Sequence, residues 1–431
     1  MPPFQHPRLA VPPPLMMSEP GSFAHLTLTQ RWPAIAQRTI DENNFPTDIV
    51  VALETLVQGL FEGKVRLLED ENAPDLAEWS TYLHPYLNCS WIEVPWFFAE
   101  VYFYRRLLEA TRYFQPGAWQ GFDPFHTQKH ASLTTSLEKV RAVSSQINSL
   151  HQSQFNESKK DIAWNTNLVA LLHNALWGNQ ADLSLKPTVD LVFESNAETE
   201  FEQAQKTHVL VDDTDKLLDW FAEQGKGEER WRSHPRIDLV ADNAGFELIC
   251  DLFLIDLLLT QPSPFTVYLH LKIHPTFVSD ATIVDVHHTL AVLSNDREMS
   301  VQSLAERLKN YLAIGRLQLL ADPYWVSPLE LWELPQTLHH ELSQSNLVIL
   351  KGDANYRRLL GDRHWSFTTR FEEIVCYFLS PLLALRTLKS EVVAGLQPEQ
   401  VGLLNQIDPG WLTNGEWGVM QFADLPGLGL Q

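Results

Sequence analysis

The stretch "IDLVADNAGFELICDLFLIDLLL", residues 237–259, decides the fold class. A short apolar run at 237–242 ends in an acid and an amide, Asp242 and Asn243. After a glycine-containing turn, a long and nearly all-apolar segment occupies 244–259. The run has the length and composition of a buried strand and the segment those of a buried helix. The stretch therefore predicts a strand that gives way to a helix at a polar turn.

The same pattern recurs after about residue 165, where short apolar runs alternate with helical segments. Further strands are expected at 265–273 and 346–353, and further helices at 300–315 and near 371–379. Two more runs, 191–195 and 208–213, could be strands or helix edges. Alternation of this kind is typical of βα units. We therefore predict an α/β fold with a largely parallel sheet.

The chain before this region is helical in pattern. Helices are expected at 48–63, 96–114 and 132–154, the last being polar and surface-lying. We predict three parts: an irregular Pro-rich arm at 1–27, a helical subdomain at 28–160 and an α/β catalytic core at 161–431.

Composition narrows the classes of function. The 431 residues carry a formal net charge of -22, which disfavours nucleic acid and anionic membranes as partners. Three acids, Glu247, Asp251 and Asp256, interrupt the most apolar segment and argue against a membrane span. The three cysteines form no CxxC pair, and the N-terminus lacks a basic region followed by an apolar stretch. We predict a cytoplasmic protein without a cysteine-based zinc site.

Three of the expected strands end in polar residues. The first ends at Asp242 and Asn243, and the next leads through "HPTFVSD" to Asp280. The third ends in "KGDANYRR", which supplies Lys351, Asp353, Asn355, Tyr356 and Arg357. Ligands of open parallel sheets bind beyond the carboxyl ends of the strands, so these tips are expected to converge on one crevice.

The residue types in this crevice suit a metal and a phosphate. Asp242, Asn243 and Asp280 offer only oxygen donors, which a hard cation such as Mg or Mn prefers. Gly245 lies at the start of a helix whose N-terminal amides favour an anion. The cations that a phosphate would need are Lys351, Arg357, Arg386 and Lys389.

Structural interpretations compete at each position. Asp242 and Asn243 could simply cap a helix, Asp280 could cap the next segment, and Asp353 could belong to an Asx turn. Arg386 and Lys389 could form a solvated helix face. Glu247 is expected to face the crevice, whereas Asp251 is expected to be a partnered structural acid. His287 and His288 lack a metal-binding spacing, and we interpret them as packing or surface histidines.

Four motifs in order carry a resemblance to a known family. They are "ADNAGFELICDL" (241–252), "FVSDAT" (277–282), "KGDANYRRLLGD" (351–362) and "LRTLK" (385–389). With them the chain resembles the damage-control phosphatases, a former family of unknown function. The most similar branch was also named for acidic residue methyltransferases and carries an Arg-Thr-x-Lys motif near the C-terminus, which is Arg386 to Lys389 in this chain.

The resemblance implies a Rossmann-like α/β/α core with a helical N-terminal subdomain. It implies that Asp242, Asn243 and Asp280 are metal ligands and catalytic residues, the metal being Mn, Mg, Co or Ni. It further implies a small phosphorylated metabolite as substrate, such as the sugar phosphate fructose 1-phosphate. The substrate contacts implied are Glu247, Lys351, Asp353, Asn355, Tyr356, Arg357 and Lys389.

The leading hypothesis is metal-dependent phosphomonoester hydrolysis, with Asp280 or Asp353 positioning a water or with Asp242 attacking directly. The alternative is carboxyl methylation with S-adenosylmethionine, although no GxGxxG motif occurs in the α/β half. A catalytically silent binding module is a third hypothesis. The sequence leaves the physiological substrate, the preferred metal and the oligomeric state open.

Overall fold

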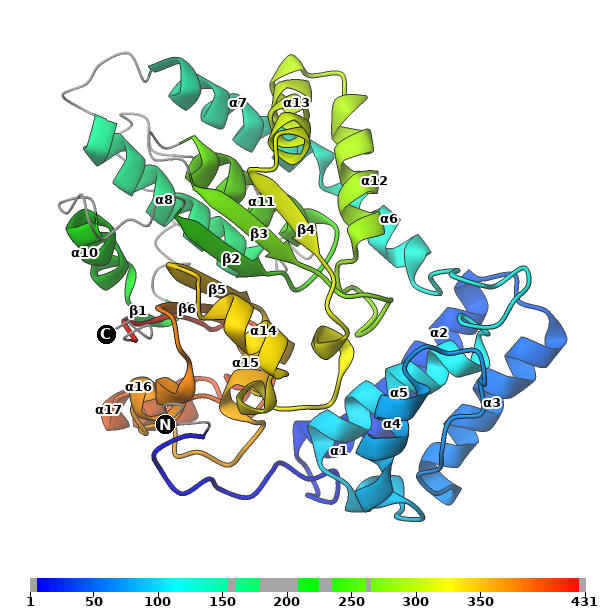
Figure 1. The fold of residues 1–431 in the computed structure, drawn as a ribbon. Coiled ribbons are helices and arrows are strands. Elements are labelled where there is room, and N and C mark those ends of the chain that lie inside the picture. Colours follow the sequence, from blue (N-terminus) through cyan, green and yellow to red (C-terminus); the bar gives the residue numbers. More distant parts are fainter. Residues whose placement is uncertain (1–5, 154–159, 179–207, 225–234, 261–264, 426–431) are drawn as a thin grey trace.

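The architecture is a three-layer α/β sandwich with a helical lobe at one side (Figure 1). The structure, a computed structural model, describes residues 6–153, 160–178, 208–224, 235–260 and 265–425. In the described part of the chain, seven strands form one sheet in the order β1-β7-β6-β5-β2-β3-β4, and only the β6–β7 pair is antiparallel. The strands are β1 (Val209–Asp212), β2 (Arg236–Val240), β3 (Thr266–His270), β4 (Leu317–Leu320), β5 (Leu347–Lys351), β6 (Leu382–Thr387) and β7 (Gly418–Ala423).

Two hydrophobic cores lie on the two faces of this sheet, because successive strand residues point to opposite faces. In β5, Ile349 packs into one core, while Val348 and Leu350 pack into the other. The first core is covered by α7 (Leu137–Ser153), α8 (Lys160–Trp177), α10 (Thr214–Gln224), α11 (Phe246–Leu259), α12 (Ile283–Ser294) and α13 (Met299–Ala313). The second is covered by α14 (Gln336–Leu342), α15 (Asp353–Leu360), α16 (Phe371–Ile374) and α17 (Pro398–Ile407).

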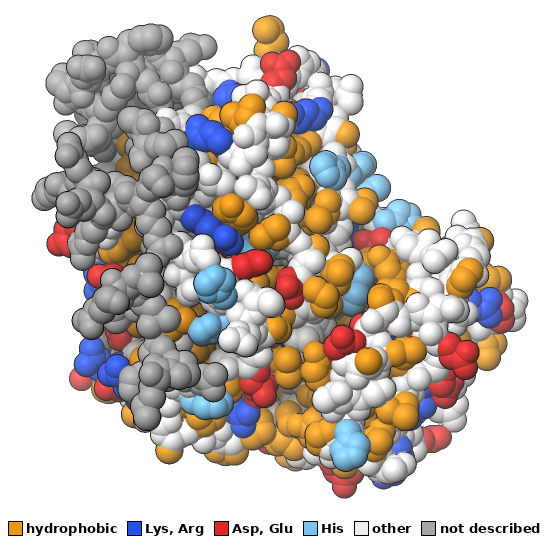
Figure 2. All heavy atoms as spheres, in the orientation of Figure 1, with side chains coloured by type: hydrophobic (Ala, Val, Ile, Leu, Met, Phe, Trp, Pro, Cys, Tyr) orange, Lys and Arg blue, Asp and Glu red, His pale blue; other side chains and the backbone are white. Residues whose placement is uncertain are grey.

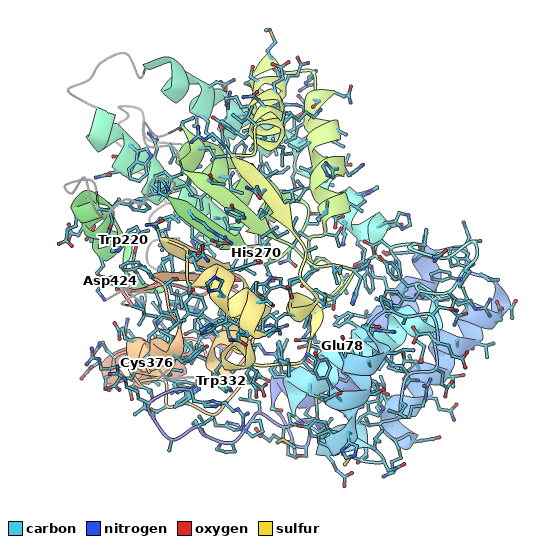
Figure 3. The ribbon with its side chains drawn as sticks, viewed as in Figure 1. Glu78, Trp220, His270, Trp332, Cys376 and Asp424 are labelled. Carbon is cyan, nitrogen blue, oxygen red and sulfur yellow. The ribbon has the colours of Figure 1, made fainter. Side chains whose placement is uncertain are left out.

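The helical lobe shares the second of these cores. It contains α1 (Phe23–Leu26), a π-helical turn (Thr27–Arg31), α2 (Trp32–Glu42), α3 (Thr47–Glu62), α4 (Leu76–Leu83) and α5 (Trp96–Ala110). Aromatic side chains fill it, with Trp32 stacked on Phe103 at 4.9 Å between ring centroids. Helix α6 (His126–Thr135) then leads back to the sheet. In Figure 3, Glu78 marks the lobe, and His270 marks the sheet.

The fold class predicted from the sequence is confirmed, since the sheet is mostly parallel and helices cover both faces. The runs at 237–242, 265–273 and 346–353 contain β2, β3 and β5, and 208–213 contains β1. The run at 191–195 lies outside the described residues. The expected helices at 48–63, 96–114 and 300–315 are α3, α5 and α13, and 132–154 spans the end of α6 and all of α7. The segment near 371–379 forms α16 and a short 3-10 turn at Val375–Tyr377.

One local interpretation is wrong. Arg386 does not lie on a solvated helix face, because residues 382–387 are strand β6 and the Arg386 side chain is buried within the sheet. The boundary at residue 160 stays a prediction; α7, on the lobe side of it, packs on α11 and α13. The Pro-rich arm becomes helical at Phe23, and before that Pro14 pairs with Arg363 of the core.

The surface carries both signs of charge. On the face shown in Figure 2, basic and acidic side chains are interspersed among hydrophobic ones. Of the helices that the structure describes, none has the length and apolarity needed to cross a bilayer.

Candidate metal and phosphate site

The polar residues that follow β2 and β3 meet at the carboxyl edge of the sheet. Asn243 and Asp280 pair as an isolated bridge. Its neighbours extend the pairing, since the amide of Ala281 donates to the carbonyl of Asp242 at 2.8 Å and the amide of Ala244 donates to the carbonyl of Ser279 at 2.7 Å. The structure therefore brings Asp242, Asn243 and Asp280 together, as expected from the strand-end rule.

Asn243 is oriented by three side chains. Its Nδ2 donates to Asp242 Oδ2 and to Glu247 Oε2, both at 2.8 Å. Its Oδ1 accepts from the Ser279 hydroxyl at 2.5 Å. An amide oxygen has two lone pairs, so one remains for a ligand. Neither residue is the N-cap of α11, because Gly245 occupies that position and no side-chain cap hydrogen bond is made there.

Gly352 allows Asp242 to lie where it does. A Cβ at Gly352 would meet Asp242 Cγ at 2.0 Å, and the residue adopts φ +86, a backbone conformation that favours glycine. The "KGD" turn is thus needed for the close approach of β5 to Asp242. Sequence reasoning considered only an Asx turn at Asp353 and missed the glycine.

Four buried acids and two buried lysines lie where the residues after β2 and β3 meet. Lys351 Nζ lies 3.0 Å from both Glu247 Oε1 and Asp251 Oδ1. Lys272 Nζ lies 3.4 Å from Asp280 Oδ2 and 3.4 Å from Asn355 Oδ1. The acids are Asp242, Glu247, Asp251 and Asp280. Negative charge therefore exceeds positive charge in the interior of the site.

This imbalance perturbs the acids. Burial, together with the nearby charges of Glu247 and Asp280, raises the pKa of Asp242 well above its ordinary value. Burial raises the pKa of Asp280 to about 6, although the Lys272 ammonium partly offsets this effect. Both carboxylates would be stabilised as anions by an added cation.

The donor set fits a hard divalent cation. Asp280 Oδ2 is buried without a hydrogen bond, with only the Lys272 ammonium at 3.4 Å as an ion-pair partner, and the backbone pairing brings Asp280 beside Asn243, which follows Asp242. In the described ranges, no three His, Cys, Asp or Glu side chains gather closely enough to enclose a metal by themselves. A cation at this point would therefore rely on the amide and on exogenous oxygens as well as on the two carboxylates.

The cations of the Arg-Thr-x-Lys motif have different roles. Arg386 donates from Nε to Asp353 Oδ1 at 2.9 Å, and its other nitrogens bond Val392 and Ser390. Lys389 is only partly buried, and no carboxylate in the described part of the chain lies within ion-pairing distance of its ammonium. Its positive charge acts to lower the pKa of Asp242.

Two predicted substrate contacts are directed elsewhere. Arg357 donates to Glu100 of α5 at 2.5 Å and to Asp362 at 2.8 Å, and it lies 3.6 Å over the Trp96 ring. Tyr356 donates its hydroxyl to Gln421 at 2.7 Å. These donors are already used inside the protein. In this structure Arg357 joins the lobe to the core and Tyr356 supports the sheet, and their roles as substrate contacts stay predictions.

Asn355 and the paired histidines are likewise structural in this conformation. Asn355 Nδ2 donates to the carbonyls of Ala241 and Lys351, so it fastens α15 to β2 and β5. His287 is exposed, and His288 stacks on His130 at 4.0 Å.

A cavity of about 360 Å³ opens beside Asn243 and Glu247. Its far wall comes from the helical lobe and α6, through Arg38, Gln128 and Ser132. Sequence reasoning missed these residues, because nothing in a helical pattern shows which face meets a distant loop. It also missed Lys272 and Ser279. The available signal for Lys272 was a lysine two residues after the end of β3, within the apolar run at 265–273.

Comparison with known proteins gives consistent matches over nearly the whole chain. The family model for the damage-control phosphatase ARMT1-like domain matches residues 27–404. Proteins named damage-control phosphatase ARMT1 from Danio rerio, Bos taurus and Homo sapiens are 31%, 33% and 31% identical to it. These alignments cover 94%, 93% and 96% of this chain and 95%, 96% and 98% of the relatives.

A solved structure of a DUF89 family protein from Pyrococcus horikoshii is also similar. It has a TM-score of 0.44 and 16% sequence identity, and the match covers 85% of this chain and 91% of that one.

Proposed function

The chain belongs to the damage-control phosphatase family with the ARMT1-like domain, and from this premise we propose that it is a metal-dependent phosphatase of small phosphorylated metabolites. The metal would be Mn, Mg, Co or Ni, held by Asp242, Asn243 and Asp280. The proposal leaves the cytoplasmic location expected from the sequence as a prediction.

One observation carries this proposal. Asp242, Asn243 and Asp280 meet at the carboxyl edge of the sheet, where buried carboxylates outnumber buried ammonium groups. An isolated excess of buried negative charge is costly unless a cation compensates it. A divalent cation would balance this excess and would polarise the phosphorus of a bound phosphate.

The residues around the three donors would hold the reacting groups in place. Ser279 and Glu247 bond opposite ends of the Asn243 amide and so keep its oxygen directed at one point. Asp353 Oδ1 accepts from Arg386 Nε at 2.9 Å and from the backbone amide of Lys389 at 3.3 Å. Asp353 would therefore position the loop that carries Lys389 and leave Asp280 as the carboxylate that orients an attacking water.

Lys389 would bind the phosphate. Its ammonium has no ion-pair partner in the described part of the chain, whereas Lys351 is already held by Glu247 and Asp251. A free ammonium beside the metal ligands can neutralise charge on the equatorial oxygens of the phosphoryl group. Lys351 would act indirectly, by fixing Glu247.

The cavity favours a sugar phosphate, with fructose 1-phosphate as an example. Its wall offers polar groups from Arg38, Gln128 and Ser132, which can hydrogen-bond a polyol. Among the described residues that line it, none is aromatic. A nucleotide base would therefore lack the stacking partner that base-binding sites commonly supply.

Carboxyl methylation with S-adenosylmethionine is the weaker alternative. The turn after β2 reads "ADNAG" and lines the cavity with Asn243 and Ala244 rather than with a glycine-rich loop. Titration calorimetry separates the alternatives, because tight S-adenosylmethionine binding without metal would support methylation.

The test is a hydrolysis screen over sugar phosphates and nucleotides with each of Mg, Mn, Co and Ni. Wild-type protein should release phosphate from a sugar phosphate only with metal, and Asp280→Asn should abolish that release. Asp256→Asn is the matched control, since Asp256 is a buried acid held by Arg307 at 2.7 Å outside the site. Equal turnover by wild type and Asp280→Asn would contradict the assignment.

A further inference from the structure

The chain that leads to Asp280 passes through a strained turn. Phe277 and Val278 have φ values of +48 and +69, which non-glycine residues rarely adopt. Val278 is β-branched, so its side chain crowds the backbone most strongly in this region. Such a conformation persists only where surrounding structure holds it. We call residues 277–278 the elbow.

Aromatic contacts with the helical lobe hold the elbow. The ring of Phe277 lies 5.1 Å from Tyr104 and 6.5 Å from Phe97, both on α5. Upstream in the same segment, His274 lies 5.7 Å from Phe114 and 6.3 Å from Tyr113. The segment after β3 therefore docks on the lobe before it returns to the sheet.

The residues next to the elbow form the site. The amide of Ser279 donates to the carbonyl of Phe277 at 2.9 Å, which closes the turn. Ser279 then bonds Asn243, and Asp280 pairs with it. Val278 and Ser279 both line the cavity. Any relaxation of the elbow would move Ser279 and Asp280 relative to Asp242 and Asn243.

We propose that Phe277 is a positioning residue: the grip of Tyr104 and Phe97 on its ring holds the elbow and so sets Asp280 and Ser279 against Asn243. The inference rests on the proposed function, because it assumes that this constellation binds a metal. It makes the helical lobe part of the site through a contact that touches neither metal nor substrate.

The first test measures Mn²⁺ affinity by electron paramagnetic resonance, without any assay of turnover. Phe277→Leu and Tyr104→Leu should each weaken Mn²⁺ binding about tenfold, as removal of outer-sphere support typically does. The double variant should bind no worse than either single one, because both changes break one contact. Phe98→Leu is the control: Phe98 is also buried on α5, but its ring contacts Tyr86 and Tyr102 within the lobe.

The second test uses rescue to separate positioning from general loss of stability. Glycine adopts positive φ without a penalty, so Val278→Gly removes the strain at the β-branched residue and leaves only that of residue 277. In this background Phe277→Leu should recover a large part of the lost Mn²⁺ affinity. In a Val278→Ala background the φ penalty remains, and the loss should persist.

The outcomes are decisive. Wild-type affinity in Phe277→Leu, equal losses in Phe98→Leu and Phe277→Leu, or failure of glycine to rescue would each overturn the positioning role. If the wild-type protein itself binds no Mn²⁺, the proposed metal site fails together with this inference. If the wild type binds Mn²⁺ and Phe277→Leu binds it with equal affinity, only the positioning role of Phe277 is refuted, and the proposed metal site stands.

Discussion

Asp238 and Asp242 belong to the same segment of chain, and both are buried, at 0% and 6% relative exposure. Asp238 lies within β2 and accepts from Arg236 at 2.7 Å, from His270 at 2.7 Å and from Ser345. Although burial alone would raise its pKa, these partners hold the pKa of Asp238 below the ordinary value. Asp238 is a compensated charge.

Asp242 lies just beyond the same strand, and its charge is not compensated by cationic partners as that of Asp238 is. It accepts one side-chain hydrogen bond, from Asn243, and faces the acids Glu247 and Asp280. Its pKa is shifted upward where that of Asp238 is shifted downward. Buried charge thus stabilises the fold at one position and remains available to a ligand at the other. The difference teaches that burial alone does not separate structural acids from functional ones, whereas the set of partners does.

The largest expected effect is on turnover by Asp242→Asn. Loss of the proposed metal ligand and of its negative charge should lower metal-dependent phosphate release by about a thousandfold. Without metal, the variant should be at least as stable as wild type, because a repelled buried charge is removed. Urea unfolding and a phosphate-release assay check both halves. A large loss of stability in Asp242→Asn would show that Asp242, like Asp238, stabilises the fold.

The converse is expected for Asp238→Asn. Removal of one partner from a buried ion pair leaves Arg236 and His270 uncompensated, so the free energy of unfolding should fall by about 3 kcal/mol. Turnover per folded molecule should stay close to wild type, as measured below the unfolding temperature. Loss of activity without loss of stability would show that Asp238 serves the site.

Lys389 and Lys351 allow the same comparison between an uncompensated and a compensated charge, with a smaller expected effect on activity. Lys389→Met should raise KM for the phosphorylated substrate about thirtyfold, or about 2 kcal/mol, and leave the melting temperature nearly unchanged. Lys351→Met should destabilise the protein, because Glu247 and Asp251 lose their cation. Equal losses of stability in the two variants would remove the distinction between free and held cations.

The smallest expected effect is on the pH dependence of the free energy of unfolding, to which the two aspartates contribute with opposite sign. The depressed pKa of Asp238 means that its stabilisation is present above about pH 4 and is lost as pH falls through the folded-state pKa. The raised pKa of Asp242 means that metal-free wild type loses stability as pH rises above about 4. The deficit of Asp238→Asn should therefore shrink toward acid, and the gain of Asp242→Asn should grow toward neutral pH.

This dependence is measured by urea unfolding of wild type and both variants in chelator, at several values between about pH 4 and pH 8. Parallel curves for the two variants would contradict the assigned environments.

The sequence by itself determined the class of fold and indicated which polar strand ends would meet at one edge of the sheet. Apolar runs that alternate with helical segments are a local property of the chain, and parallel strands place their carboxyl ends at one edge. For this reason "ADNAG" and "FVSD" could be predicted to meet, and the four motifs indicated the family that the comparisons show.

Only the tertiary structure decided which polar residues are free. "KGDANYRR" contains Lys351, Asn355 and Arg357 within a few residues. Each is nevertheless bonded to a side chain distant in sequence, namely Asp251, Lys272 and Glu100 respectively. The strained elbow at Phe277 and the lobe residues of the cavity are equally invisible in the sequence. The physical reason is that a charge is compensated by whatever packs against it in space, and a local pattern does not record those neighbours.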